Sequence, residues 1–123
     1  MIYGVGVDLV DIDRVRRLLK KNESKFLSRC FTNKEIEYSN KFSDPSKRLA
    51  ARFAAKEAVM KSLGCGWRQI KWKDIEITGG EKPTANFKKA AYDKALEKNI
   101  NFVHVSLSHE NNKAIAFAVS EKK

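Results

Sequence analysis

The chain has 123 residues, of which 42% are hydrophobic and 33% charged, a balance typical of one folded domain over residues 1–123 and not of a disordered segment. No apolar run approaches the roughly 20 residues of a membrane span, and the start at Met1 lacks the charged leader of a signal peptide. The net charge of +10 predicts a polyanionic partner: nucleic acid, a phosphorylated cofactor or an acidic protein.

The first predicted element is a strand over residues 2–9, because apolar side chains alternate along it. Its other face carries Gly4, Gly6 and then Asp8. Since glycine weakens a strand, two glycines on one face predict the close approach of another group or backbone. Asp8 is the first residue on this face with a functional group in its side chain. The alternative is an ordinary Asp at the end of a strand, next to a turn.

A helix with a basic stripe is predicted next, capped by Asp11 or Asp13. Arg14, Arg17 and Lys21 stand at positions i, i+3 and i+7, so they share one side of this helix. Such a stripe is often only a solvated face. A run of cations without an intervening acid nevertheless favours a docking site for an acidic partner. The two cysteines, Cys30 and Cys65, do not have the spacing of metal ligands. They are therefore expected to be reduced thiols in a cytoplasmic protein.

The longest predicted helix covers residues 49–63, which are rich in strong helix formers. Pro45 suits its first position and Gly64 its C-terminal stop. Before it, Thr32 and Glu35 form the capping box of a short helix. The chain is therefore expected to build its first half around one long central helix.

Two rows of functional side chains are predicted on the central helix. Phe53, Glu57 and Lys61 lie along one stripe, and Arg52 and Lys56 form an adjacent pair. A carboxylate among cations on an alanine-rich helix suits close packing against something anionic. The alternative is a core helix with an exposed Glu–Lys pair, which contributes only about 0.2–0.5 kcal/mol.

The second half is predicted to contain strands at residues 74–78 and 84–87, a helix at 88–98, and a hairpin of residues 102–108 and 113–120. The fold class is therefore α+β, with a mostly antiparallel sheet and packed helices.

Asp8, Glu57 and His109 are the candidates for a chemical site. Two carboxylates from separate segments can fill part of the coordination shell of Mg²⁺ and leave its other positions to water and substrate phosphates. Nearby cationic side chains would neutralise the remaining charge of the phosphates. An isolated histidine such as His109 is otherwise most often a loop hydrogen-bonding residue. The chain has no HExxH motif, paired Cys-x-x-Cys or Walker loop, so zinc proteolysis and P-loop NTPase chemistry lack their signatures.

Four motifs occur in a recognisable order: Gly6-Val-Asp8 followed by Arg14, Arg52-Phe-Ala-Ala-Lys-Glu-Ala58 with Lys61 and Gly64, Asp74-Ile-Glu-Ile77, and His104-Val-Ser-Leu-Ser-His109. Together they resemble the small bacterial 4′-phosphopantetheinyl transferases, the holo-[acyl-carrier-protein] synthases, from Met1 to about Val119. One departure is Glu81, which stands where the family typically has Gly directly before a basic residue and Pro.

The resemblance implies a 4′-phosphopantetheinyl transferase-like fold and transfer of the 4′-phosphopantetheine arm of coenzyme A to a serine of the acyl carrier protein, for fatty acid biosynthesis. Asp8 and Glu57 would hold Mg²⁺ on the diphosphate, and Lys61 would reach a phosphate oxygen as a point charge. The base for the serine would be Glu57 or a metal-bound water.

The same resemblance implies where the two substrates bind. Arg52, His109 and Lys56 would lie near the nucleotide end of coenzyme A, while the basic stripe of Arg14, Arg17 and Lys21 would dock the acidic carrier protein. It also implies a cytoplasmic homotrimer with active sites between subunits, and neither a membrane nor a nucleic acid as partner.

Two other functions are weighed against this one. A basic module for nucleic acid would use the aromatics Trp67 and Trp72, but no helix-turn-helix, RNP or zinc signature is found. In a purely structural subunit, Asp8 and Glu57 would tolerate alanine.

Overall fold

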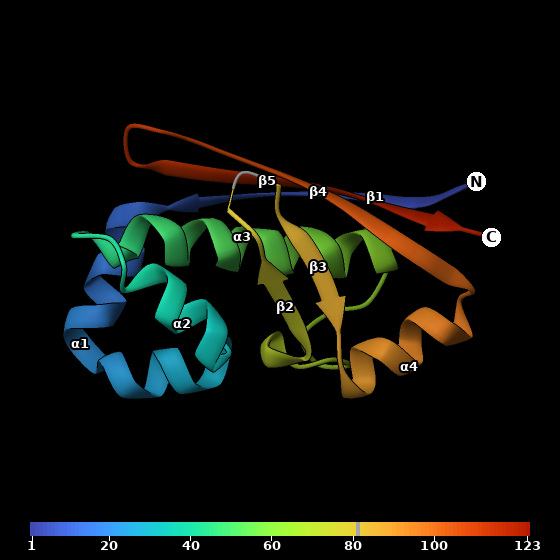
Figure 1. Cartoon of the computed structure of the whole chain (residues 1–123), viewed down its shortest axis with the longest axis horizontal. Coiled ribbons are helices and arrows are strands. Elements are labelled where there is room, and N and C mark those ends of the chain that lie inside the picture. The colour runs from blue at the N-terminus through green and yellow to red at the C-terminus, as the bar shows by residue number, and fades with distance from the viewer. Residues whose placement is uncertain (81) are drawn as a thin grey trace.

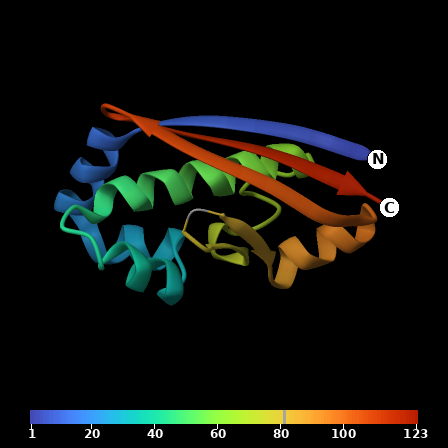
Figure 2. The same cartoon turned by 45° about the horizontal axis from the view of Figure 1, so that its top comes forward.

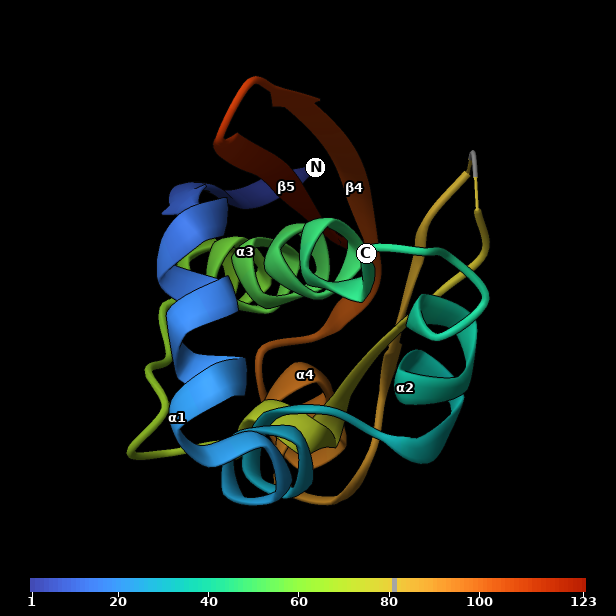
Figure 3. The same cartoon turned by 90° about the vertical axis from the view of Figure 1, so that its left-hand side faces the viewer.

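Helix α3 (Pro45–Leu63) runs through the middle of the molecule and separates two groups of elements (Figure 1). The computed structural model describes residues 1–80 and 82–123. A three-stranded sheet covers one side of α3, and the other helices and a two-stranded sheet pack on its remaining sides, as the view along the helix also shows (Figure 3). This arrangement confirms the predicted α+β class with one long central helix.

Both sheets are antiparallel, with the strand orders β1-β5-β4 and β2-β3. The two termini lie at the same end of the molecule (Figure 2). Along the chain the elements besides α3 are β1 (Ile2–Asp11), α1 (Ile12–Cys30), α2 (Asn33–Ser39), the 3₁₀ turn η1 (Trp72–Asp74), β2 (Ile75–Thr78), β3 (Thr84–Phe87), α4 (Lys89–Glu97), β4 (Ile100–Glu110) and β5 (Lys113–Lys122).

The ends of the helices follow the local signals in the sequence. Asp44 caps α3 by accepting a hydrogen bond from the backbone N–H of Ser46, and Gly64 ends it with a φ of 73°. A left-handed C-terminal residue is the position that glycine occupies without strain. At α2, Thr32 and Glu35 form the predicted capping box, in which both reciprocal hydrogen bonds are present. The predicted ends of α3 and the predicted start of α2 are confirmed.

Small side chains let the three-stranded sheet approach α3 closely. The inner face of β5 presents Ala114, Ala116 and Ala118, and each of them is fully buried, as are Ala54 and Ala58 on the helix. Close-packed interiors leave no room for larger groups where two backbones approach in this way. The contact between sheet and helix is therefore built from alanine and glycine.

The strand predicted over residues 74–78 begins one residue later in the structure, because Asp74 belongs with Trp72 to the turn η1 before β2. The larger side chains of β5, Ile115 and Phe117, point away from α3 and are 40% and 46% exposed. The closeness of α3 explains this orientation, because the side of β5 that faces the helix has space only for alanine.

Candidate active site

The two glycines of β1 place this strand directly against the backbone of α3. A Cβ atom on Gly6 would lie 2.0 Å from the carbonyl oxygen of Ala58, and one on Gly4 would lie 2.3 Å from that of Ser62. These distances confirm that the glycine face meets another backbone closely. Two strand residues thus correspond to about one helical turn. Continuing this spacing by one step, we expect Asp8 to lie opposite the turn of α3 that contains Glu57.

Lys61 connects the strand and the helix at this point. Its Nζ atom donates a hydrogen bond to the carbonyl oxygen of Val7, at 2.9 Å, and lies 3.4 Å from Oδ1 of Asp8. The Lys61 side chain is about half exposed and that of Asp8 is mostly covered. Asp8 and Lys61 therefore belong to the same patch of surface, and the charge of Lys61 is directed at Asp8.

Glu57 is half-buried and has a neighbour that the sequence did not indicate. The indole Nε1 of Trp72 donates a hydrogen bond to Oε1 of Glu57, at 3.2 Å. Indole N–H is a donor only, so the contact leaves the charge of the carboxylate in place. Within the described part of the chain, Oε2 of Glu57 has no side-chain partner.

The carboxylates of Asp8 and Glu57 suit Mg²⁺ and not a metal that needs a complete protein cage. Among residues 1–80 and 82–123, no group of three or more His, Cys, Asp or Glu side chains is placed to hold a metal ion. Mg²⁺ commonly binds one or two carboxylates and takes its other ligands from water and substrate phosphates. Hard oxygen donors at the half-covered junction of strand and helix fit this cation.

The structure contradicts the predicted nucleotide contact of Lys56. Its side chain is fully buried, and Nζ forms an ion pair with Oε1 of Glu35 at 2.6 Å. Nζ also donates to the carbonyl oxygens of Cys30 and Trp72, at 2.8 and 3.0 Å. Burial lowers the pKa of Lys56, while the carboxylate of Glu35 opposes that shift. All three ammonium donors are used inside the protein, so Lys56 holds elements together and does not reach a ligand.

Arg52 and His109 lie in one pocket of about 310 Å³, although β4 and α3 are far apart in the sequence. The guanidinium of Arg52 lies 4.2 Å from the ring centroid of Tyr38 and donates from Nη2 to the carbonyl oxygen of Gly79, at 3.1 Å. Arg52 is only 3% exposed, and its Nε atom is buried without a hydrogen-bond partner in the described residues. Lys47 and Arg48, which no motif in the sequence indicated, add further positive charge to this pocket.

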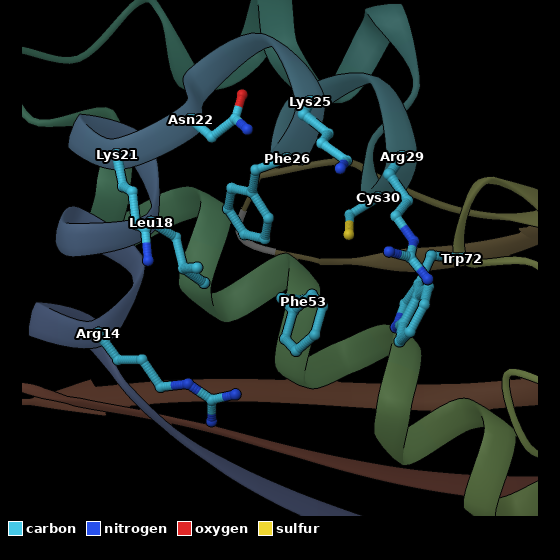
Figure 4. Close-up of a pocket in the computed structure, with 10 residues that line it drawn as sticks. All are labelled: Arg14, Leu18, Lys21, Asn22, Lys25, Phe26, Arg29, Cys30, Phe53 and Trp72. Carbon is cyan, nitrogen blue, oxygen red and sulfur yellow. The ribbon is translucent and has the colours of Figure 1, made fainter.

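The basic stripe of α1 borders a second hollow, of about 360 Å³, between α1 and α3 (Figure 4). Helix α1 bends at Asn22, which has a φ of −158° and a ψ of 69°, so its second half turns back over the groove. Arg14 and Lys21 lie at its rim, whereas Arg17 is not part of its lining. We call this hollow the α1–α3 groove; its lining consists of Arg14, Leu18, Lys21, Asn22, Lys25, Phe26, Arg29, Cys30, Phe53 and Trp72.

Trp72 and Glu81 are the other two residues for which the sequence led to an expectation. Trp72, a candidate stacking surface for nucleic acid, has its ring between those of Phe53 and Trp67, with centroids 5.8 and 5.9 Å away. The ring of Trp72 therefore packs against two aromatic neighbours. Glu81, where the sequence departs from the family pattern, lies outside the described residues.

Comparison with known proteins decides the family. Residues 4–119 match the model of the family described as the 4′-phosphopantetheinyl transferase superfamily. The chain belongs to this superfamily. The resemblance found in the sequence motifs is thereby confirmed over nearly the whole chain.

Named relatives of this transferase chain carry one description, holo-[acyl-carrier-protein] synthase. That of Clostridium tetani is 40% identical and that of Clostridium perfringens strain SM101 is 44% identical; the alignments cover 98% of this chain and 97% and 95% of the respective relatives. The crystal structure from Neisseria meningitidis superimposes with a TM-score of 0.90 at 37% identity, over 99% of this chain and 100% of that chain. The one from Helicobacter pylori, described as a complex with coenzyme A, has a TM-score of 0.84 at 32% identity and covers 95% and 99%.

None of the helices in the described ranges 1–80 and 82–123 has both the length and the apolar character needed to cross a bilayer.

Proposed function

We propose that this protein transfers the 4′-phosphopantetheine group of coenzyme A to a serine hydroxyl of an apo acyl carrier protein, in support of fatty acid biosynthesis. The serine oxygen attacks the phosphorus that bears the pantetheine arm, and the bond to the leaving phosphate of adenosine 3′,5′-bisphosphate breaks. The serine proton passes to Glu57 or to a water molecule. The observation that supports this proposal is the close contact of Gly4 and Gly6 with the backbone of α3, and the names of the relatives supply the substrates.

The junction of Asp8, Glu57 and Lys61 is the proposed diphosphate site. When bound there, Mg²⁺ would neutralise the charge that grows on the leaving phosphate. Lys61 keeps Asp8 oriented through their 3.4 Å contact and offers its exposed ammonium to a phosphate oxygen. Because the two carboxylates are negative, they need a bound cation before they can accept a diphosphate. The positive net charge of the chain attracts the anionic coenzyme A to the site.

The pocket of Arg52 and His109 is the proposed site of the 3′-phosphate. A buried guanidinium remains protonated in proteins, and the unpartnered Nε atom of Arg52 has hydrogen-bonding capacity left for an anion. Lys47 and Arg48 stand at the same pocket. A phosphate there would satisfy a buried donor that would otherwise destabilise the structure by about 1–3 kcal/mol.

We expect the variant Arg52→Gln to bind coenzyme A about 10- to 100-fold more weakly, because a charged hydrogen bond contributes about 1.5–3 kcal/mol. Isothermal titration calorimetry with coenzyme A and with dephospho-coenzyme A, which lacks the 3′-phosphate, measures the effect. The variant and the wild type should bind dephospho-coenzyme A with similar affinity. An equal loss for both ligands would remove Arg52 from the 3′-phosphate.

The α1–α3 groove is the proposed docking site of the carrier protein. Its floor is apolar at Leu18, Phe26 and Phe53, and its rim is cationic (Figure 4). An amphipathic acidic helix would match both parts, with an apolar side chain in the hollow and carboxylates beside Arg14 and Lys21. The rim charges would act mainly by steering the encounter.

We expect Arg14→Glu to weaken carrier-protein binding about 10-fold or more, mainly through slower association at low salt, with coenzyme A affinity nearly unchanged. Arg17→Glu is the matched control, since it makes the same charge change on α1 outside the groove lining. Surface plasmon resonance with immobilised apo carrier protein measures both variants. Equal effects of the two would point to general electrostatics and not to this groove.

The outer face of the three-stranded sheet is the proposed contact between subunits of a homotrimer. This outer face is apolar and exposed, and no helix of the described chain covers it. A contiguous apolar surface of this kind is typical of protein contacts, and the number of three copies follows the family resemblance. The face consists of Tyr3, Val5, Val7, Leu9, Phe102, Ile115 and Phe117.

We expect Phe117→Asp to convert the assembled protein to monomers, because an ionised carboxylate cannot be buried there without a partner. Leu96→Asp is the control, since Leu96 is an exposed apolar residue of α4 away from this face. Sedimentation velocity of the wild type and both variants gives the oligomeric state. A wild type that is monomeric at micromolar concentration would contradict the assembly.

The transfer reaction itself is tested by incubating an apo carrier protein with coenzyme A, Mg²⁺ and this protein. Mass spectrometry should show the phosphopantetheine adduct on the carrier serine, and none when Mg²⁺ is replaced by a chelator. Absence of the adduct with the carrier protein of the source organism would reject the proposed function. The cytoplasmic location stays a prediction, as does a single transferase domain over residues 1–123.

A further inference from the structure

Trp72 lies at the edge of the α1–α3 groove, and its other contacts indicate a role that the docking of a carrier protein does not use. Its ring is stacked with that of Phe53, at an interplanar angle of 20°, and with that of Trp67, at an angle of 8°. Its backbone carbonyl oxygen accepts a hydrogen bond from the buried Lys56, at 3.0 Å. Both the ring and the backbone of Trp72 are therefore held in place, which leaves its indole N–H pointing in one fixed direction.

That direction is toward Glu57. The Nε1 atom of Trp72 donates to Oε1 of Glu57 at 3.2 Å. A glutamate side chain on a helix surface samples several rotamers, and a fixed donor on one carboxylate oxygen restricts them. The other oxygen then has a defined position from which to bind a cation. Donors that orient a metal-binding side chain typically change metal affinity 10- to 100-fold when they are removed.

We infer that Trp72 is a positioning residue for the metal site: its indole N–H orients Glu57, and the stack of Phe53, Trp72 and Trp67 with Lys56 fixes the indole. In this role Trp72 acts through Glu57 and contacts neither the cation nor coenzyme A. The inference rests on the proposed metal role of Glu57. The buried Lys56 contributes indirectly, because it holds the backbone of Trp72.

The test uses Mn²⁺ as the probe, with free Mn²⁺ measured by electron paramagnetic resonance in the presence of coenzyme A. Trp72→Phe keeps a stacking ring and loses only the N–H, so Mn²⁺ should bind about 10-fold more weakly. Trp67→Phe is the matched control: it alters the neighbouring indole of the stack, which has no contact with Glu57, and should bind Mn²⁺ as the wild type does. If both variants weaken binding equally, or if Trp72→Phe binds as the wild type does, the inference is overturned.

Glu57→Ala separates this inference from the proposed function. Wild-type Mn²⁺ affinity in Glu57→Ala would reject the metal role of Glu57 itself. A loss in Glu57→Ala together with wild-type affinity in Trp72→Phe would reject only the positioning role of Trp72.

A measurement on the unaltered protein covers the case in which Trp72→Phe is poorly folded. The chain has two tryptophans, so a ¹⁵N-labelled sample gives two indole N–H resonances, which Trp67→Phe assigns. On addition of Mg²⁺ with coenzyme A, the resonance of Trp72 should shift and that of Trp67 should stay nearly unchanged. An immobile Trp72 resonance would overturn the inference.

Discussion

Asp8→Ala and Glu57→Ala should each reduce the rate of phosphopantetheine transfer at least about 100-fold, while the protein stays folded. A metal that stabilises transition-state charge contributes several kcal/mol, and about 1.4 kcal/mol corresponds to a factor of ten in rate. Adduct formation followed by mass spectrometry over a range of Mg²⁺ concentrations measures the loss. Thermal unfolding followed by circular dichroism checks the fold.

Glu97→Ala provides the control for these two variants. Glu97 lies on α4 with an exposed side chain, and among residues 1–80 and 82–123 its carboxylate is paired only with Lys94 of its own helix. Its removal should leave transfer unchanged. Normal turnover in either Asp8→Ala or Glu57→Ala would exclude that carboxylate from the metal site and would favour a structural role for it.

Lys56→Met should lower the free energy of unfolding by about 3–5 kcal/mol, because it leaves the buried carboxylate of Glu35 without its counter-charge. Folded domains are typically stable by only about 5–15 kcal/mol, so the variant is expected to be partly unfolded at moderate temperature. Urea denaturation followed by circular dichroism measures the difference. The expected loss identifies Lys56 as part of the interior of the protein.

The surface pair of Lys94 and Glu97 is the matched control, with an N–O distance of 3.6 Å and both side chains in contact with solvent. Lys94→Met should change stability by less than about 1 kcal/mol, as is usual for exposed ion pairs. The double variant Lys56→Met with Glu35→Met should recover only part of the loss, since the backbone N–H groups of Thr32 and Ile77 lose their acceptor. Unchanged stability of Lys56→Met combined with weaker coenzyme A binding would restore the nucleotide contact expected from the sequence.

The features that could be predicted from the sequence depend on local rules. Gly64 ends α3 because a left-handed residue is needed there, and Thr32 with Glu35 starts α2 through bonds within one helical turn. The face of Gly4 and Gly6 was also interpretable, since glycine has few other reasons to recur on one side of a strand.

The features that were missed depend on packing between distant segments. Lys56 follows Arg52 on the same side of α3, and the sequence offered no sign that only Lys56 meets a buried acid from α2. Trp72 was interpreted as a surface aromatic, because its contact with Glu57 exists only when η1 folds back on α3. The alternative of nucleic acid binding relied on Trp67 and Trp72 as separate surface aromatics, whereas the two rings stack on each other.

The backbone contact at Gly6 has a consequence for how this protein can vary. Gly6 has no side chain, and the nearest atoms of α3 at this point are the carbonyl group of Ala58 and the Cβ of Lys61, so the separation of the strand from the helix is set almost entirely by main-chain atoms. Repacking of the surrounding core can therefore proceed without altering the spacing between the two acidic groups. A single methyl group at position 6, by contrast, would push the strand away from the helix and carry Asp8 with it.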